Sequence, residues 1–367
     1  MAKTNLRIAL FVYFCAEFYL TKQIHMKLSK GQKITFGSLI GLLLVFLLVI
    51  GLFFNKPLAK DKSFSLFITP GMTVTQMLDT LRAKSDYTGF LAFKSMVKAV
   101  GLSDSELVQG YYKIQAKEPF YRVFMQIKRG RQSPVNFIFN NLRTKEQFAA
   151  RVADQMLIDS VDVITLLNDS AFTAKQGFTP QTVPAMLIPN TYQFYWNTNA
   201  ETLLEKLNGE YKRFWNDERR EKASQIGLSP VEVATLASIV EEESANRKEQ
   251  PRIAGLYLNR LRTGMPLQAD PTVKFAIGNF ELKRILSGHL AFESPYNTYL
   301  NTGLPPGPIR IPSIHAIDAV LNREQHNYIY MCAKEDFSGT HNFAASYEEH
   351  QRNAARYRKA LNERGIN

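Results

Sequence analysis

Three consecutive glutamates, at positions 241–243, close the segment SPVEVATLASIVEEE, which covers residues 229–243. Ser229 is a favoured helix N-cap, Pro230 suits the first helical position, and Glu232 can complete a capping box with the serine. These residue types predict a helix that begins at Ser229 and carries all three carboxylates in its last turn. Carboxylates in such a place can do acid or base chemistry when their surroundings shift their pKa values.

The three glutamates are expected to have different surroundings. At helical spacing Leu236, Val240 and Glu243 share one face, which is apolar up to its terminal carboxylate. Glu242 is expected to point into solvent, and Glu241 to lie on a stripe of small residues. Partial desolvation would raise the pKa of Glu243 and keep a proton on it near neutral pH, as general-acid cleavage of a glycosidic bond requires. Spacing alone leaves a frayed and exposed helix end as the alternative.

Polar side chains downstream of this helix are candidates for binding a sugar. They lie in the segments LQADPTV, SPYNTYLN and THNFAASY, and their amides and hydroxyls suit N-acetyl and sugar hydroxyl groups. If the chemistry uses a second carboxylate, the candidate is Asp270, although an acid beside Pro271 is equally suited to a turn. Folding roles compete with binding for each residue. The candidates are Gln268, Asp270, Thr272, Tyr296, Asn297 and His341, of which Tyr296 can stack on a sugar ring.

Several other kinds of chemistry find no support in the sequence. The six histidines show no HExxH or other metal-ligand spacing, and no GxSxG motif is present. The two cysteines, Cys15 and Cys332, lie on opposite sides of a long apolar segment and form no CxxC motif. We therefore expect no metal, no cofactor and no disulfide framework.

The bulk composition indicates a folded protein with an anionic neighbour. Of the 367 residues, 45% are apolar and 21% are charged, and the formal net charge is +12. An anionic lipid surface, an acidic polymer or nucleic acid would each attract such a chain. No dense block of Lys and Arg with interleaved aromatic residues occurs, so nucleic acid is the weakest candidate and is not an expected partner.

Residues 36–54 read FGSLIGLLLVFLLVIGLFF and contain no charge. A helix of this length rises about 28 Å, which matches the hydrocarbon core of a bilayer. The run ends in FFNKPLAK, a poor cleavage site, so a transmembrane anchor is favoured over a signal peptide. A mild excess of lysines before the run places residues 1–35 in the cytoplasm and the remainder outside. Residues 1–25 are expected to lie outside the native chain, because MKLSKGQK from Met26 is an ordinary opening for an anchor.

Beyond the anchor, the patterns predict a mixed α+β protein in two parts. Residues 57–63 are expected to form a short linker. Residues 64–133 have the strand–helix–helix–strand content of a small module, which suits either a structural spacer or a glycan-binding domain. Residues 134–367 are expected to form a larger α+β domain that contains the helix at 229–243.

The residues around and after Glu243 form an ordered series of long motifs. ASIVEEES is followed by IAGLYLNRLRTGMPLQADPTVKFAIG, then by SPYNTYLNTGLPPGPIRIPS and THNFAASYEEH. Across residues 180–350 this series resembles the MltG/YceG-like family of endolytic murein transglycosylases. Residues 64–133 resemble the LysM-like module that precedes the catalytic domain in that family. The resemblance implies that Glu243 is the catalytic glutamate and that Glu241 is structural or supporting.

The resemblance also implies a function and a location. Such a lytic transglycosylase cleaves the bond between N-acetylmuramic acid and N-acetylglucosamine within a glycan strand and leaves a 1,6-anhydro end, which would terminate a growing strand. The expected partners are peptidoglycan strands, the lipid bilayer and peptidoglycan synthases. The expected location is the cytoplasmic (inner) membrane, with the catalytic domain outside. The sequence departs from the family at Asn190, where an acid is common, and around Ile311, so sugar contacts there stay open.

Two alternatives remain at this point. A membrane-anchored, non-catalytic scaffold that binds peptidoglycan for the synthesis proteins would not need Glu243. An ordinary muramidase would use Glu243 but would give reducing muramic acid ends instead of anhydro ends. Substitution of Glu243 distinguishes the scaffold from an enzyme. Identification of the product ends distinguishes a muramidase from a lytic transglycosylase.

Overall fold

A computed structural model describes residues 29–282 and 284–365. The expectation for residues 1–25 therefore lies outside the described part of the chain. The contacts divide the chain into two compact units. The first holds the described residues up to Leu66 together with Gly71–Leu107 and Lys113–Arg129, and the second holds Phe67–Pro70, Val108–Tyr112 and everything from Gly130 onward.

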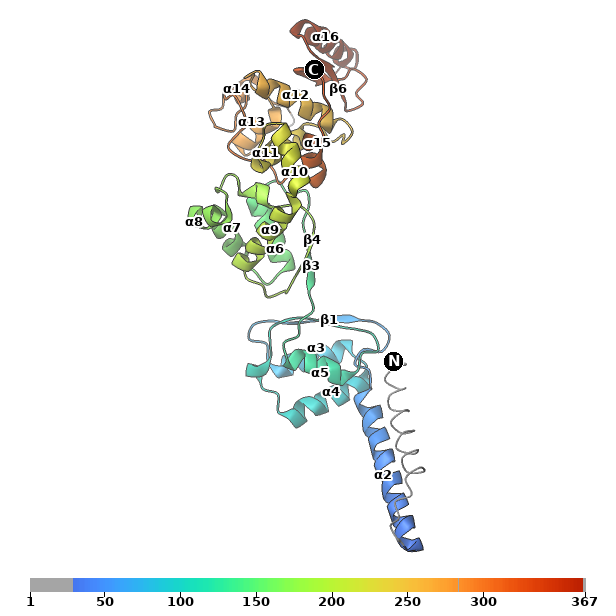
Figure 1. Cartoon of the computed structure of the whole chain (residues 1–367). Coiled ribbons are helices and arrows are strands. Elements are labelled where there is room, and N and C mark those ends of the chain that lie inside the picture. Colours follow the sequence, from blue (N-terminus) through green and yellow to red (C-terminus); the bar gives the residue numbers. More distant parts are fainter. Residues whose placement is uncertain (1–28, 283, 366–367) are drawn as a thin grey trace. The chain divides into compact units, whose positions relative to one another are not determined.

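The first unit begins with α2 (Lys30–Phe54), a helix of 25 residues that contains the apolar run (Figure 1). Its stretch Ile34–Phe54 is long and apolar enough to cross a membrane, and none of its most apolar window is buried inside the protein. This confirms an apolar helix at residues 36–54 that begins a few residues earlier than expected. The leucine and valine side chains of this stretch are exposed, and a continuous row of them needs an apolar solvent, which a bilayer provides.

The residues that follow α2 form a small module with the strand–helix–helix–strand content that its sequence pattern predicts. Most of it belongs to the first unit, and parts of its two strands are grouped with the second. β1 and β2 pair with each other, and the helices bury apolar side chains such as Met77, Phe93 and Phe124 between them. Its likeness to a LysM module stays a prediction. The elements are β1 (Phe64–Ile68), α3 (Val74–Lys84), α4 (Tyr87–Val100), the 3-10 turn η1 (Asp104–Glu106), β2 (Gly110–Ile114) and α5 (Phe120–Lys128).

The linker expected at residues 57–63 is wrong in its first part. Leu58 and Ala59 are 0% and 2% exposed, and Pro57 forms a β-bridge with Pro119. Leu58 and Ala59 pack into the core of the module. The chain therefore joins the module directly after α2.

The first half of the second unit surrounds a two-stranded antiparallel sheet. β3 (Val135–Ile138) pairs with β4 (Thr191–Phe194) in the register Val135↔Phe194 to Ile138↔Thr191. Residues 200–225 form two helices, which are separated at Trp215 and Asn216, where the asparagine caps the second. The helical elements are α6 (Lys145–Gln155), α7 (Ser160–Asn168), α8 (Ser170–Gln176), η2 (Val183–Met186), α9 (Ala200–Phe214) and α10 (Asp217–Gln225).

The second half of this unit is built around α11 (Pro230–Glu243). The Ser229 capping box is present: Ser229 N donates to Glu232 Oε2 at 2.7 Å, and Glu232 N donates to Ser229 Oγ at 3.3 Å. The remaining elements are α12 (Gln250–Arg262), α13 (Asp270–Ile277), α14 (Ser287–Leu290), α15 (Ile314–Leu321), β5 (Tyr330–Ala333), β6 (His341–Ala344) and α16 (Tyr347–Glu363). β5 and β6 pair antiparallel, so the described fold is mixed α+β.

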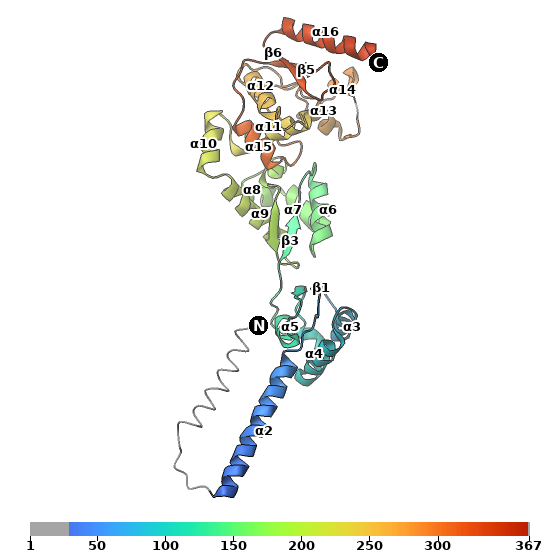
Figure 2. The ribbon, with the colours of Figure 1, turned by 90° about the vertical axis from the view of Figure 1, so that its right-hand side faces the viewer.

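The helix α11 is buried on all sides along most of its length. All eight residues from 233 to 240 are buried, and α12, α13 and α15 pack against the helix (Figure 2). The expectation of one apolar face is therefore too narrow, because three neighbouring helices enclose the helix. Its first turn, residues 230–232, and its last turn, residues 241–243, leave the core.

Two helix glycines offer a matched test of this packing. A Cβ at Gly255 in α12 would lie 2.3 Å from the Glu324 carbonyl oxygen, whereas a Cβ at Gly209 in α9 meets nothing within 4 Å. We expect Gly255→Ala to lower the free energy of unfolding by about 1–3 kcal/mol through overpacking. Gly209→Ala should raise it by up to about 1 kcal/mol through helix propensity. Denaturant unfolding of both variants measures this, and equal stability would contradict the packing described around α12.

Candidate active site

Glu243 is the last residue of α11 and reaches the surface only in part. Its Oε2 atom is enclosed by protein and accepts no hydrogen bond among the described residues. Burial raises the pKa of Glu243 to about 7, and the nearby Asp270 carboxylate acts in the same direction. The His341 imidazole, the Tyr257 hydroxyl and the Arg260 guanidinium oppose this rise. Glu243 is therefore a carboxyl group that can both hold and release a proton near neutral pH.

Tyr257, in the middle of α12, is a site residue that the sequence analysis missed. The side chain is 1% exposed, and its hydroxyl makes no close hydrogen bond in the described structure but lies near enough to the Glu243 carboxyl group to lower the pKa of that group. Burial, followed by the nearby Glu243 carboxylate, raises the pKa of Tyr257 well above its ordinary value. The signal available in the sequence was one phenol within the otherwise apolar helix stretch IAGLYL, but such a tyrosine is more often ordinary core. The result is a neutral hydroxyl beside the carboxyl group.

His341 is held by a second missed residue, Glu249. The backbone N–H of His341 donates to Glu249 Oε1 at 2.8 Å, and its Nδ1 lies 2.8 Å from Oε2 of the same carboxylate. Burial alone would lower the pKa of His341, but the Glu249 carboxylate outweighs it, with a further contribution from Glu243, so the pKa is raised. The imidazole is thus biased toward its cationic form next to Glu243.

Glu249 also connects His341 to the end of α11. Ser244, the residue that follows Glu243, donates from Oγ to Glu249 Oε2 at 3.2 Å. Gln250 Nε2 donates to the Ser244 carbonyl oxygen at 2.9 Å. The end of α11, the start of α12 and the start of β6 are therefore joined through one buried carboxylate.

Asp270 lies on the same cleft as Glu243, at the first position of α13. Its Oδ1 accepts a hydrogen bond from the Tyr299 hydroxyl at 2.6 Å. The cleft has a volume of about 390 Å³ and combines carboxyl groups with two cations. It is lined by Glu242, Glu243, Asp270, Pro271, Lys274, Arg284 and Ile285.

Glu242 does not point into solvent, and that expectation is wrong. Arg143 donates to it from Nε at 3.1 Å and from Nη2 at 2.7 Å, and Arg310 donates from Nη1 at 2.7 Å. The Glu242 side chain is only 15% exposed. Both arginines come from segments that are distant from Glu242 in sequence, and they pack over the end of α11. Residue spacing within the helix could not predict these contacts, so it indicated solvent at this position. Glu242 is thus neutralised by two cations.

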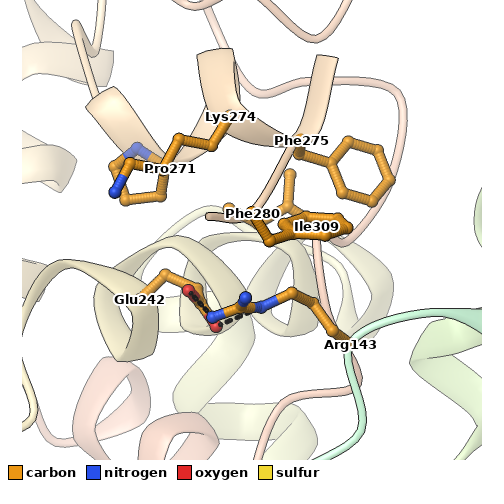
Figure 3. A pocket seen from close by; sticks show the side chains of 7 residues that line it. All are labelled: Arg143, Glu242, Pro271, Lys274, Phe275, Phe280 and Ile309. Atoms are coloured by element: carbon orange, nitrogen blue, oxygen red, sulfur yellow. Dashed lines mark hydrogen bonds and ion pairs between the residues drawn. The ribbon is translucent and has the colours of Figure 1, made fainter. Parts of the chain in front are cut away.

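A small pocket of about 50 Å³ lies above this ion pair (Figure 3). Pro271 and Lys274 line one side, and Phe275 and Phe280 line the other, with the Glu242–Arg143 pair at the base of the view. The Arg143 guanidinium also lies 4.9 Å from the centre of the Phe280 ring. The pocket shares three of its lining residues with the larger cleft, so the two form neighbouring parts of one surface.

Glu241 is bound to the proline-rich loop, and its supporting role in the site stays a prediction. Its Oε2 accepts a hydrogen bond from the backbone N–H of Ser313 at 2.9 Å and lies 3.4 Å from Nε of Arg310. Ile311, between these two residues, is buried, and its N–H donates to the Leu142 carbonyl oxygen at 3.1 Å. Glu241 therefore fixes the proline-rich loop to the end of α11.

The predicted sugar-binding residues fall into two groups. Asp270 and His341 lie at Glu243, and the exposed Gln268 is two residues before Asp270 in a left-handed backbone conformation with φ 50°. Thr272 is completely buried, where its hydroxyl donates to the Ala269 carbonyl oxygen at 2.7 Å. Its hydroxyl is therefore engaged within the fold.

Asn297 and Tyr296 lie in the loop that crosses this region. Asn297 is 0% exposed, and its Nδ2 donates to the carbonyl oxygens of Leu290 and Phe292 at 2.9 and 2.8 Å. The Tyr296 ring lies 4.8 Å from that of Phe275, and burial raises its pKa. The hydrogen bonds of Asn297 lie within the loop, and the Tyr296 ring packs against α13. A role of either side chain in sugar binding stays a prediction.

The site contains one carboxyl group that can carry a proton, that of Glu243. The His341 imidazole, the Tyr257 phenol and the Asp270 carboxylate lie around it. Glu243 can donate a proton to the oxygen of a bond that breaks and can accept one afterwards. His341, held by Glu249, can stabilise the negative charge that Glu243 acquires between these steps. This combination suits acid-catalysed cleavage of an acetal such as a glycosidic bond.

Comparison with known proteins gives consistent findings. A model of the YceG-like family matches residues 66–356. An "Endolytic murein transglycosylase" of Bacillus subtilis (strain 168) is 28% identical over 334 residues, which cover 84% of this chain and 89% of that relative. A protein of the same name from Streptococcus pneumoniae serotype 2 (strain D39 / NCTC 7466) is 30% identical over 225 residues, which cover 60% of this chain and 40% of that relative. The crystal structure of a putative yceG-like protein from Listeria monocytogenes aligns with a TM-score of 0.52 and 25% identity, over 80% of this chain and 99% of that one.

The Glu249–His341 pair predicts that the pKa of His341 depends on the Glu249 carboxylate. Glu249→Gln removes the carboxylate that favours the imidazolium, so the pKa of His341 should fall. NMR titration of histidine-labelled protein measures this. Glu324→Gln, which changes an exposed carboxylate paired with Arg252, is the matched control and should leave His341 unaffected. An unchanged His341 titration in Glu249→Gln would contradict the pairing.

Proposed function

The chain belongs to the YceG-like family, and from this premise we propose that it is an endolytic murein transglycosylase that cleaves peptidoglycan strands with Glu243 as its catalytic group. The observation that carries the proposal is the buried Oε2 of Glu243 on an open cleft, with its pKa raised to about 7. A carboxyl group in that state is protonated often enough to act as an acid and is basic enough to take a proton back.

The proposed reaction uses Glu243 twice. The carboxyl group first gives its proton to the oxygen that joins C1 of N-acetylmuramic acid to N-acetylglucosamine, and the C1–O bond breaks. The resulting carboxylate then takes the proton of the C6 hydroxyl of the same muramic acid as that oxygen bonds to C1. The product has a 1,6-anhydro end, Glu243 regains its proton, and no water is consumed.

The surrounding groups support the charged stages of this reaction. His341 in its cationic form stabilises the Glu243 carboxylate after the first step, and the Tyr257 hydroxyl is placed beside it. Asp270, on the same cleft, is suited to stabilise positive charge that develops at C1. Gln268, Thr272, Tyr296 and Asn297 are proposed to shape the sugar-binding surface, Thr272 and Asn297 through the loops that they hold.

The proposed location follows from α2 and its flanks. The apolar helix is suited to anchor the chain in a membrane, and the lysines before it support a cytoplasmic N-terminus with the catalytic unit outside. The membrane is then the cytoplasmic (inner) one. Peptidoglycan synthases are proposed partners, because cleavage near the membrane would terminate strands as they emerge.

Glu243→Gln should abolish strand cleavage, with a loss of at least about 10²-fold, because the amide cannot transfer the proton. The full-length chain in detergent is incubated with glycan strands, and the products are identified by mass spectrometry. Glu221→Gln, an isosteric change of an exposed acid on α10, is the control and should retain activity. Retained activity in Glu243→Gln would favour a non-catalytic or differently catalysed role. Reducing muramic acid ends from the wild-type chain would identify a muramidase.

The pH dependence of cleavage should follow Glu243. Because the first step needs the protonated acid, the rate should fall as pH rises through about 7, the pKa of Glu243. Initial rates across the pH range, with folding checked by circular dichroism at each end, measure this limb. A rate that stays constant well above pH 8, about one pH unit beyond that value, would contradict the assignment of Glu243 as the acid.

A further inference from the structure

The small module of the first unit is joined to the membrane helix without free chain between them. Lys56, two residues after α2, accepts a hydrogen bond at its carbonyl oxygen from Phe120 N at 2.9 Å. Leu58 N donates to the Glu118 carbonyl oxygen at 2.9 Å, and Pro57 bridges Pro119. The segment before α5 is therefore fixed directly at the end of the anchor.

Aromatic rings reinforce this joint. The ring of Phe120, at the start of α5, lies 5.4 Å from the Phe53 ring and 6.0 Å from the Phe54 ring. Tyr121 lies 6.3 Å from Phe54, and the Lys56 ammonium lies 5.7 Å from the centre of the Phe53 ring. Aromatic and lysine side chains at the end of an apolar span gather at the headgroup level of a bilayer. The start of α5 thus packs directly against the end of the apolar helix.

The helix α4 begins at the same joint. Asp86, its N-cap, donates from its backbone N–H to the Leu58 carbonyl oxygen at 2.9 Å. A Cβ on Gly89 would lie 2.0 Å from the Pro57 carbonyl oxygen, so the first turn of α4 is in direct backbone contact with the residues after α2. Figures 1 and 2 both show α4 on the side of the module that lies toward α2.

The face of α4 that the module leaves uncovered has the composition of an interfacial helix. Phe90, Phe93 and Val97 are buried on the inner side. On the other side Tyr87 is 69% exposed and Leu91 is 43% exposed. Lys94 and Lys98 continue this exposed row at spacings of three and four residues, and neither forms an ion pair in the described part of the chain.

We propose that α4 lies on the membrane surface next to the anchor and binds its phospholipid headgroups. Tyr87 and Leu91, nearest the joint, enter the interfacial layer, and Lys94 and Lys98 contact the phosphates of anionic lipids. Two features favour lipid as the occupant: α4 starts in backbone contact with the residues that follow the apolar helix, and lysine and phosphate carry opposite charges. The module is then a part of the anchor that rests on the bilayer.

Depth-dependent fluorescence quenching tests this placement without reference to catalysis. The full-length chain, with Cys15→Ser and Cys332→Ser, carries one fluorophore at Leu91→Cys and is reconstituted in nanodiscs that contain phosphatidylglycerol. Quenching by spin labels at the lipid headgroup and upper acyl chain should be several-fold stronger there than at Ser105→Cys, an exposed control in the same module. Equal quenching at the two positions, or stronger quenching at 105, would overturn the proposal.

A second label position tests whether the helix α4 as a whole lies at the membrane, and a charge variant tests the role of its lysines. Tyr87→Cys should be quenched like Leu91→Cys, which guards against a local effect at one position. Lys94→Gln with Lys98→Gln should reduce quenching at position 91 in phosphatidylglycerol discs and leave it unchanged in phosphatidylcholine discs. Lys212→Gln, on α9 of the other unit, is the matched control and should have no effect. Equal loss of quenching in both kinds of disc would overturn the role of lysine charge.

Discussion

The burial of α11 on every side from residue 233 to residue 240 constrains everything around the site. The first turn of the helix uses its one carboxylate, Glu232, in the capping box, and the last turn carries three carboxylates that follow one another. The Glu242 carboxylate is paired with two arginines, and Glu241 accepts the N–H of Ser313. Glu243 alone retains a buried oxygen without a hydrogen-bond donor. Glu241 and Glu242 thus bind neighbouring segments to the end of α11. The Glu243 carboxyl group, next to them, can exchange a proton.

The chemistry of Glu243 depends on a balance between burial and charge. Burial and Asp270 raise its pKa, while His341, Tyr257 and Arg260 limit the rise, so that the value lies near 7. A stronger rise would leave the group an acid that releases its proton poorly, and a smaller one would leave it ionised before reaction. Glu249 maintains this balance indirectly, because it fixes His341 by two hydrogen bonds and favours its cation.

Local patterns predicted the parts of this structure that depend on neighbouring residues. The capping box at Ser229, the helix that ends in the glutamates and the apolar span were all evident, since each is set by residues within a few turns. Interactions between distant segments were not: Arg143 is 99 positions from Glu242, and Glu249 is 92 from His341. The solvent expected around Glu242 and the linker expected at 57–63 failed for the same reason. Helix spacing singled out Glu243 among the three glutamates, the family resemblance implies that it is catalytic, and the structure adds the groups that surround it.

The most direct test of this account is the pKa of Glu243 in the folded protein. Glutamate labelled with ¹³C at the side-chain carboxyl reports each titration by NMR, and the signal lost in Glu243→Gln identifies the residue. A titration near 7 would agree with a buried carboxyl group poised to act as acid and then base. A titration near the ordinary value of 4.5 would show that Glu243 is ionised at neutral pH, which contradicts its proposed part in the reaction.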